Sequence, residues 1–329
     1  MAVLVSGGAG YIGSHMVLEL LDRGEKVVVL DNLSTGFWWA VPPEAVFVQG
    51  DVGDQELVEK IIAEHGVTEL AHFAARIVVP ESVSDPLGYY FNNTVKTRAL
   101  IESAVRGGVK HVIFSSTAAV YGEPDVSPVP EEITLNPINP YGRSKLMSEW
   151  MLQDAAKAHG FTYVALRYFN VAGADPKLRS GQSSPNATHL IKVASQAALG
   201  QRDGLTVFGT DYATPDGTCV RDYIHVTDLA RAHLSALDHL RSGGASTTLN
   251  CGYGRGYSVK QVVEVVKKVS GIDFPVTLAG RRAGDPGSLV AKADRIRELG
   301  WQPEHDDLEE IVGQALAWEE KLRMRNAST

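Results

Sequence analysis

The sequence contains too few cysteines and too little positive charge for several classes of protein. Of its 329 residues only Cys219 and Cys251 are cysteines, too few for a disulfide framework. We therefore expect both thiols to be small packing residues in a reducing compartment. The net charge of −8 and the scattered arginines disfavour a nucleic-acid partner, because a phosphate backbone needs a clustered basic face.

Long hydrophobic runs are missing as well. The longest are strand-sized, far below the ~18 residues that a membrane helix needs. Residues 1–5 run directly into glycines and lack the charged and apolar regions of a signal peptide. We expect a cytoplasmic protein with no membrane partner, acting on a small ligand.

The first half alternates short β-branched runs with longer helical patterns, which is typical of βαβ units and a parallel sheet. Strands are expected at 3–6, 26–30, 46–49, 69–73, 111–115 and 163–167, and helices at 11–23, 55–65, 87–107, 141–159, 189–199, 226–241, 258–270, 292–299 and 308–323. This rhythm breaks after Asn170, where loops lengthen. We predict domains at 1–170 and 171–329, with some later elements returning to pack on the first sheet.

Gly7, Gly10 and Gly13 give the spacing G-x-x-G-x-x-G between the first expected strand and helix. This arrangement predicts a Rossmann-type, doubly wound sheet: the glycines allow a tight turn, close approach of a diphosphate and tight helix–strand contact. The diphosphate would lie on the free N–H groups where the helix begins, at Tyr11 and Ile12. A plain cluster of turn glycines is the alternative.

Asp31 ends the second expected strand, 18 residues after Gly13. A carboxylate there can accept both hydrogen bonds from the adenosine ribose hydroxyls and would repel a 2′-phosphate, so NAD is favoured over NADP. A strand-end aspartate that caps a helix is the alternative. Further cofactor contacts are expected at Asn32, Asp51, Val52, Phe73, Ala74 and Ala75. A helix cap is the alternative for Asp51 and Val52, and sheet packing is the alternative for 73–75.

Tyr141 and Lys145 are four residues apart and would share one helix face. An ammonium beside a phenol favours the phenolate, which can take a proton from a hydroxyl while hydride leaves the same carbon. Ser115 and Thr117 follow the fifth strand, and Thr117 is placed to hydrogen-bond the reacting hydroxyl. By itself the spacing of Tyr141 and Lys145 is common and is most often a surface helix pair. Thr117 alone would be a strand-end threonine.

Together these motifs resemble the extended short-chain dehydrogenase/reductase superfamily. The stretches 115–122, 167–170 and 209–226 resemble the UDP-glucose 4-epimerase family, and the resemblance covers nearly the whole chain. It implies an NAD-dependent isomerase with a smaller, mixed α/β domain that binds a UDP-sugar, and no metal. Tyr141 would be the acid/base, Thr117 would orient the 4-hydroxyl, and Lys145 would bind the nicotinamide ribose.

The resemblance also assigns binding residues. Further contacts to the cofactor are implied at Ser115, Tyr168 and, near the active site, Asn92. Contacts to the substrate are implied at Asn170, His189, Leu190, Thr206, Phe208, Arg221, Arg282 and Asp285. Two arginines match the charge of a diphosphate, although Arg221 could instead form a structural ion pair with Asp222.

Some positions depart from the family pattern. Ile77 stands where some relatives carry a lysine directed at the NAD phosphates, and 37–39 is an unusual Phe-Trp-Trp cluster that could cover the adenosine, join an interface or pack locally. Leu289 falls where a side chain is expected to face the C2 substituent of the sugar. Substrates with an N-acetylhexosamine are therefore possible alternatives. Uronate and pentose substrates are alternatives too, because the sequence does not indicate the contacts to C6 of the sugar.

Three other functions compete with epimerisation: dehydration, net dehydrogenation and sensing without catalysis. Sugar-nucleotide 4,6-dehydratases carry an Asp-Glu pair after the threonine, whereas Ala118 and Ala119 cannot move protons. A net dehydrogenase would need to exchange NAD. A non-catalytic sensor of NAD or UDP-sugars need not keep Tyr141, Lys145 and Thr117 together. The long helical stretches at 87–107 and 141–159 could pair in a homodimer, or only pack on the sheet.

Overall fold

A computed structural model describes residues 2–184, 187–282 and 285–327. Seven parallel strands form its large sheet, in the order β10-β6-β5-β4-β1-β2-β3. The strands are β1 Ala2–Ser6, β2 Lys26–Asp31, β3 Val46–Gln49, β4 Val67–His72, β5 His111–Ser115, β6 Thr162–Tyr168 and β10 Thr247–Cys251. The strand order reverses at β1, which pairs with β2 and β4. In open α/β sheets, ligands bind at the carboxyl edge of such a switch point.

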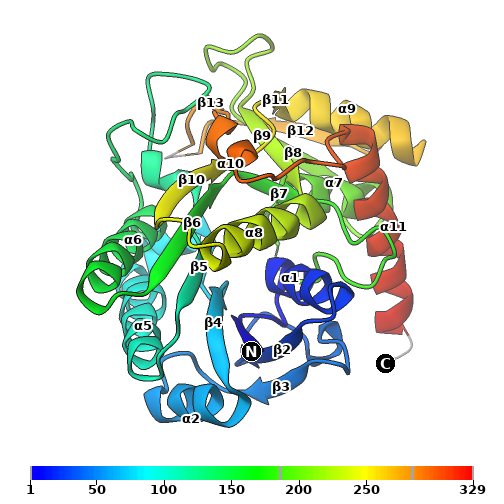
Figure 1. Cartoon of the computed structure of the whole chain (residues 1–329). Helices are drawn as coiled ribbons and strands as arrows, with labels where there is room; N and C mark the ends of the chain where they lie inside the picture. Colours follow the sequence, from blue (N-terminus) through cyan, green and yellow to red (C-terminus); the bar gives the residue numbers. More distant parts are fainter. Residues whose placement is uncertain (1, 185–186, 283–284, 328–329) are drawn as a thin grey trace.

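Helices cover both faces of the large sheet (Figure 1). They are α1 Tyr11–Asp22 and α8 Val226–Arg241 on one face, and α2 Gln55–His65, α5 Lys96–Arg106 and α6 Pro140–His159 on the other. Alternate residues of a strand face opposite sides. Accordingly Val3 and Val5 join the core beneath α1 and α8, whereas Leu4 joins the core beneath α2 and α5. The predicted doubly wound sheet is confirmed.

Polar side chains cap the starts of α2 and α6. The Asp54 carboxylate accepts the Leu57 N–H at 3.1 Å where α2 begins. Asn139 caps α6 in the same way, with its side-chain oxygen 2.9 Å from the Gly142 nitrogen. This cap places Tyr141 in the first turn of α6, and Lys145 follows one turn later on the same face.

The second region contains smaller sheets and a group of packed helices. β9 Val220–His225 pairs with β7 Asn170–Ala172, β11 Gly256–Ser258 and β13 Ser288–Leu289, and β8 Leu205–Phe208 pairs with β12 Val276–Ala279. Helices α7 Leu190–Ala198, α9 Val259–Ser270 and α11 Leu308–Ala327 pack together around a separate core. The remaining short elements are α3 Val79–Ser84, α4 Pro86–Tyr89 and α10 Asp294–Glu298.

The helical stretch expected at 87–107 is present, but it is not one uniform α-helix. Its first part is α4, followed by a π-helical stretch, Tyr90–Val95, and only then by α5. The wider π-helical turn brings Asn93 into the core, where its side chain bonds Arg76 and Ser144. In the part of the chain described, no helix has the length and apolar character to cross a membrane.

Candidate active site

The glycine loop leaves β1 and turns directly into α1. Gly7 has φ +75°, and a Cβ there would lie 2.5 Å from the Ala74 nitrogen. A Cβ on Gly13 would lie 2.1 Å from the Gly7 carbonyl oxygen. Both positions therefore require glycine for the fold itself. At Gly10 only the Gly7 oxygen lies within 4 Å of an added Cβ, at 3.2 Å, so this side of the loop is free for a ligand.

The start of α1 suits an anion. Gly10 is the N-cap residue and supplies no side-chain cap, and the first backbone bond of the helix runs from the Ser14 nitrogen to the Gly10 carbonyl. The N–H groups of Tyr11 and Ile12 precede that bond, as expected for a diphosphate site. The Tyr11 hydroxyl donates to the Gly173 carbonyl at 2.7 Å, which ties the helix to the second region.

Asp31 lies beside the loop at the end of β2. One carboxylate oxygen accepts the Ala9 N–H at 3.0 Å and the other accepts the Leu33 N–H at 2.8 Å. Each oxygen keeps capacity for another hydrogen bond, so ribose hydroxyls can still bind. Burial raises the pKa of Asp31, while the two backbone N–H groups act to lower it.

The residues around Asp51 form a second polar group at the same edge. The Asp51 carboxylate accepts bonds from Lys96 at 2.5 Å and from Asn32 at 3.3 Å, and Val52 beside it is buried. Asp54, rather than Asp51, caps α2. The helix-cap alternative for Asp51 is thereby removed.

The loop after β4 borders the glycine loop. Gly7 approaches the backbone of Phe73 and Ala74 closely, and the Phe73 ring lies 4.9 Å from that of His233. Ala75 follows, half-buried, whereas Ile77 is 49% exposed. Asn92 is half-buried, and its side-chain amide donates to Asn93 at 3.0 Å.

The expected reactive residues converge above the ends of β5 and β6. Tyr141, Lys145 and Thr117 are all buried. The Lys145 ammonium donates to the Ser115 carbonyl at 2.8 Å and lies 4.9 Å from the centre of the Phe114 ring. The Ser115 and Tyr168 hydroxyls hydrogen-bond each other. The structure therefore brings together the residues that the two motifs predicted separately.

Burial has the largest effect on the pKa values of Tyr141 and Lys145. It raises the pKa of Tyr141, against a smaller effect of the hydrogen bond with Thr117. Burial also lowers the pKa of Lys145 to about 7, while the charge of Glu149 acts to raise it. A phenolate at Tyr141 therefore requires positive charge close by.

The sequence reasoning missed an ion pair buried behind the reactive residues. The Glu149 carboxylate bonds the Arg167 guanidinium at 2.7 Å and the Ser116 hydroxyl at 2.5 Å. Glu149 lies one turn beyond Lys145 on α6, and Ser116 precedes Thr117. The pair thus joins the helix that carries Tyr141 to the strand end that carries Thr117. The i, i+4 spacing of Lys145 and Glu149 indicates only that both lie on one face of α6, and it does not point to Arg167.

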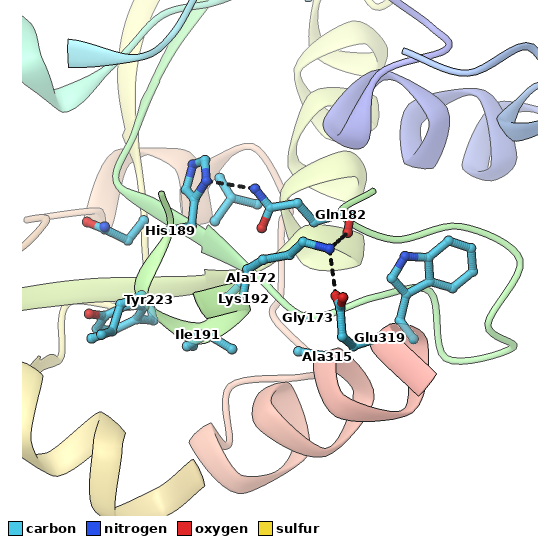
Figure 2. A pocket seen from close by; sticks show the side chains of 13 residues that line it. Ala172, Gly173, Gln182, His189, Ile191, Lys192, Tyr223, Ala315 and Glu319 are labelled. Atoms are coloured by element: carbon cyan, nitrogen blue, oxygen red, sulfur yellow. Dashed lines mark hydrogen bonds and ion pairs between the residues drawn. The ribbon is translucent and has the colours of Figure 1, made fainter. Parts of the chain in front are cut away.

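An open pocket lies between β7, α7 and α11, with a volume of about 410 Å³ that includes open solvent (Figure 2). Asn170, His189 and Leu190, all predicted substrate residues, line it. His189 bonds the Gln182 amide at 2.7 Å. The wall opposite contains a buried ion pair between Lys192 and Glu319, with nitrogen and oxygen 2.5 Å apart.

The other predicted substrate residues lie around β9 and β8. The Arg221 guanidinium is 3.9 Å from the Asp285 carboxylate, so two of them are neighbours. Arg221 does not pair with Asp222, which instead accepts the N–H groups of Tyr253, Gly254 and Ala291. The Arg282 guanidinium lies 3.7 Å from the centre of the Phe208 ring, and the Thr206 hydroxyl bonds Thr277 at 3.0 Å.

Known proteins resemble this chain in both sequence and fold. Residues 3–252 match the model of the NAD dependent epimerase/dehydratase family. A UDP-glucose 4-epimerase of Azospirillum brasilense is 58% identical, over 97% of this chain and 92% of that protein. The crystal structure of UDP-glucose 4-epimerase from Brucella ovis in complex with NAD is 46% identical with a TM-score of 0.93, covering 96% and 97% of the two chains.

The structure of the UDP-Glc/GlcNAc 4-epimerase from Campylobacter jejuni is also similar. It is 51% identical with a TM-score of 0.85, covering 97% of this chain and 99% of that one. Both the sequence and the fold are thus shared with these enzymes over nearly their full length. The chain belongs to the NAD-dependent epimerase/dehydratase family and, within it, to the UDP-glucose 4-epimerases.

Proposed function

We propose that this chain interconverts UDP-galactose and UDP-glucose by inverting C4 of the sugar, with NAD held throughout the cycle. The observation that carries the proposal is the convergence of Tyr141, Lys145 and Thr117 at the sheet edge that also presents the glycine loop and Asp31. Close relatives named UDP-glucose 4-epimerase and a neighbour structure in complex with NAD support it.

A bound NAD would supply reversible hydride transfer at C4 of the sugar, and its oxidised form would add positive charge beside Tyr141. The chain moves the proton. The Tyr141 oxygen takes it from the 4-hydroxyl and gives it back, Thr117 orients that hydroxyl, and Lys145 favours the phenolate while its ammonium is protonated. Glu149 acts to keep the ammonium charged.

Inversion requires a firmly bound nucleotide and a loosely bound sugar. Arg221 and Arg282 bind the diphosphate, Asp285 the uridine ribose, and Asn170 and His189 the phosphate side. Leu190, Thr206 and Phe208 complete the nucleotide site. These residues leave the sugar free to rotate about its bonds to the diphosphate, so that either face of C4 can be turned toward the cofactor.

A second substrate class is favoured by one relative. The Campylobacter jejuni protein is named a UDP-Glc/GlcNAc 4-epimerase and is 51% identical to this chain. Leu289, the position expected to face the C2 substituent of the sugar, ends β13 as a buried aliphatic side chain. A panel of UDP-galactose, UDP-N-acetylgalactosamine, UDP-glucuronate and UDP-xylose, followed by product separation, measures the preference directly.

The test is turnover of UDP-galactose by purified protein with added NAD. We expect UDP-glucose without net NADH release, and Tyr141→Phe should lower the rate about 10²–10⁴-fold while UDP still binds. Tyr163→Phe, buried in the core beneath α2 and α5, is the control. Unchanged activity of Tyr141→Phe removes it as the base, and no product from the wild type rejects epimerisation in favour of a sensor.

We infer that the active form is a homodimer. Large apolar side chains are exposed along α4, the π-helical stretch and α6: Leu87 is 79% exposed, Phe91 57%, Val95 51% and Trp150 54%. α6 packs beside that stretch, so these side chains form one apolar surface of a kind that usually marks an interface. A C2 dimer would bury the same surface on both copies.

The proposed roles of these residues define two domains. We propose that the NAD-binding domain comprises residues 1–170, with α8 and β10 returning to it, and that the rest of 171–329 binds the UDP-sugar. The two cysteines are free and buried, which suits a reducing compartment. We therefore place the protein in the cytoplasm.

A further inference from the structure

Two segments of the chain that lie far apart in sequence meet at Trp318 of α11. One is the loop 32–40, which follows Asp31. The other is the segment 174–184, which follows β7. Neither segment supplies a proposed catalytic residue, and both border the glycine loop.

The loop 32–40 reaches α11 through its aromatic residues. Phe37 stacks on Trp39 with ring centres 5.0 Å apart, and Trp39 lies 6.3 Å from Trp318. The Arg325 guanidinium lies 4.0 Å from the centre of the Trp39 ring, on the last turn of α11. We call Phe37, Trp39, Trp318 and Arg325 the aromatic cluster.

The segment 174–184 is held by the same helix. The Trp318 indole N–H donates to the Ser183 hydroxyl at 3.3 Å, and Gly181 lies so close that a Cβ would be 2.4 Å from the indole ring. Lys321, one turn along α11, donates to the Leu178 carbonyl at 2.7 Å. Trp318 therefore contacts both segments at once.

Both segments touch or face the loop that would hold the diphosphate. The Phe37 N–H donates to the Ala9 carbonyl at 3.0 Å, and Gly36 packs so tightly that a Cβ would lie 2.7 Å from the Ala9 carbonyl carbon. A hollow of about 200 Å³ lies between the two segments and the glycine loop. Its lining residues include Gly10, Tyr11, Thr35, Phe37, Ser180 and Ser184.

We propose that the aromatic cluster keeps the segments 32–40 and 174–184 closed beside the glycine loop and thereby slows the release of NAD. The inference rests on the proposed function, in which each turnover must end with the cofactor it began with. Release needs at least one of the segments to move away from Ala9 and Gly10. Movement of the loop 32–40 separates Trp39 from Trp318 and Arg325. Movement of 174–184 breaks the bond between Trp318 and Ser183. In either case the energy of the broken contacts is added to the barrier for release.

The test measures NAD release and not turnover. Wild type and Trp39→Ala are loaded with NAD and mixed with an enzyme that degrades free NAD, and the bound fraction is followed by chromatography. Aromatic stacking and a cation–π contact together predict about tenfold faster release from Trp39→Ala. Trp39→Phe should be intermediate, because it keeps an aromatic ring between Phe37 and Trp318.

Trp38→Ala is the matched control. Trp38 adjoins Trp39 in sequence but is 68% exposed, and its substitution should leave release unchanged. Arg325→Ala, at an exposed position, should speed release severalfold and keeps the test valid if Trp39→Ala unfolds the chain. Thermal unfolding of the NAD-free variants identifies a general loss of structure.

Two results would overturn the proposal. One is release from Trp39→Ala and Arg325→Ala at the wild-type rate, and the other is equal acceleration by Trp38→Ala. Failure of the proposed function would look different, because the wild type would then bind and release NAD but form no UDP-glucose.

Discussion

Alanine at Gly10 and alanine at Gly13 are expected to affect folding and cofactor binding differently. A methyl group on Gly13 would lie 2.1 Å from the Gly7 oxygen and 2.8 Å from its carbonyl carbon. The backbone must shift to admit it, at a cost of about 3 kcal/mol or more. A methyl group on Gly10 meets only the Gly7 oxygen at 3.2 Å, and the backbone there is extended, with φ −83°.

Gly10→Ala should therefore lower the free energy of unfolding by only about 1 kcal/mol, mainly because alanine is a poor N-cap. Its methyl group occupies the space where the diphosphate must approach the helix start. Overpacking of that kind costs about 1–3 kcal/mol, so the Kd for NAD should rise about ten- to a hundredfold. Gly13→Ala should lose stability and NAD binding together.

Urea unfolding of the NAD-free proteins and calorimetric titration with NAD separate these effects. Gly280→Ala is the control, because no atom lies within 4 Å of its added Cβ. Wild-type affinity for NAD in Gly10→Ala would refute the placement of the diphosphate against Gly10. Equal loss of stability in both loop variants would refute the division of the glycines into structural and binding positions.

Two further predictions concern pH and assembly. Burial lowers the pKa of His15 and His233 to about 4 and that of His72 to about 3, so between pH 6.5 and 4 the unfolded chain binds more protons than the folded one. The free energy of unfolding, measured by urea titration, should fall as the pH drops through that window, and a flat profile would contradict it. Phe91→Glu, which adds a charge to the exposed apolar surface, should convert a dimer to a monomer in light scattering, whereas a persistent dimer would exclude that surface.

The strands of the large sheet could be predicted because parallel, buried strands are continuous runs of apolar, β-branched residues. The glycine loop and Asp31 could be placed on them because both lie next to strand ends in the sequence. The predicted bounds differ from the structure by a few residues, as at β4, which begins at Val67.

Contacts between distant segments could not be predicted in this way. Neither Glu149 nor Arg167 carries a local signal that the other will face it across the core. The Phe-Trp-Trp stretch at 37–39 was recognisable as unusual, but its partners, Trp318 and Arg325, come from the other end of the chain. The π-helical turn that buries Asn93 rather than Asn92 also has no clear sequence signature.

The position of β10 at the edge of the large sheet has a consequence for how the chain matures. β6 is complete by Tyr168, but its outer neighbour, Thr247–Cys251, arrives only after most of the second region has been made. Until then the backbone of β6 is an unpaired edge that can join a strand of another chain. The face of α1 that later meets α8 is likewise uncovered. A fragment ending near residue 170 is therefore expected to aggregate rather than to fold as a separate nucleotide-binding unit.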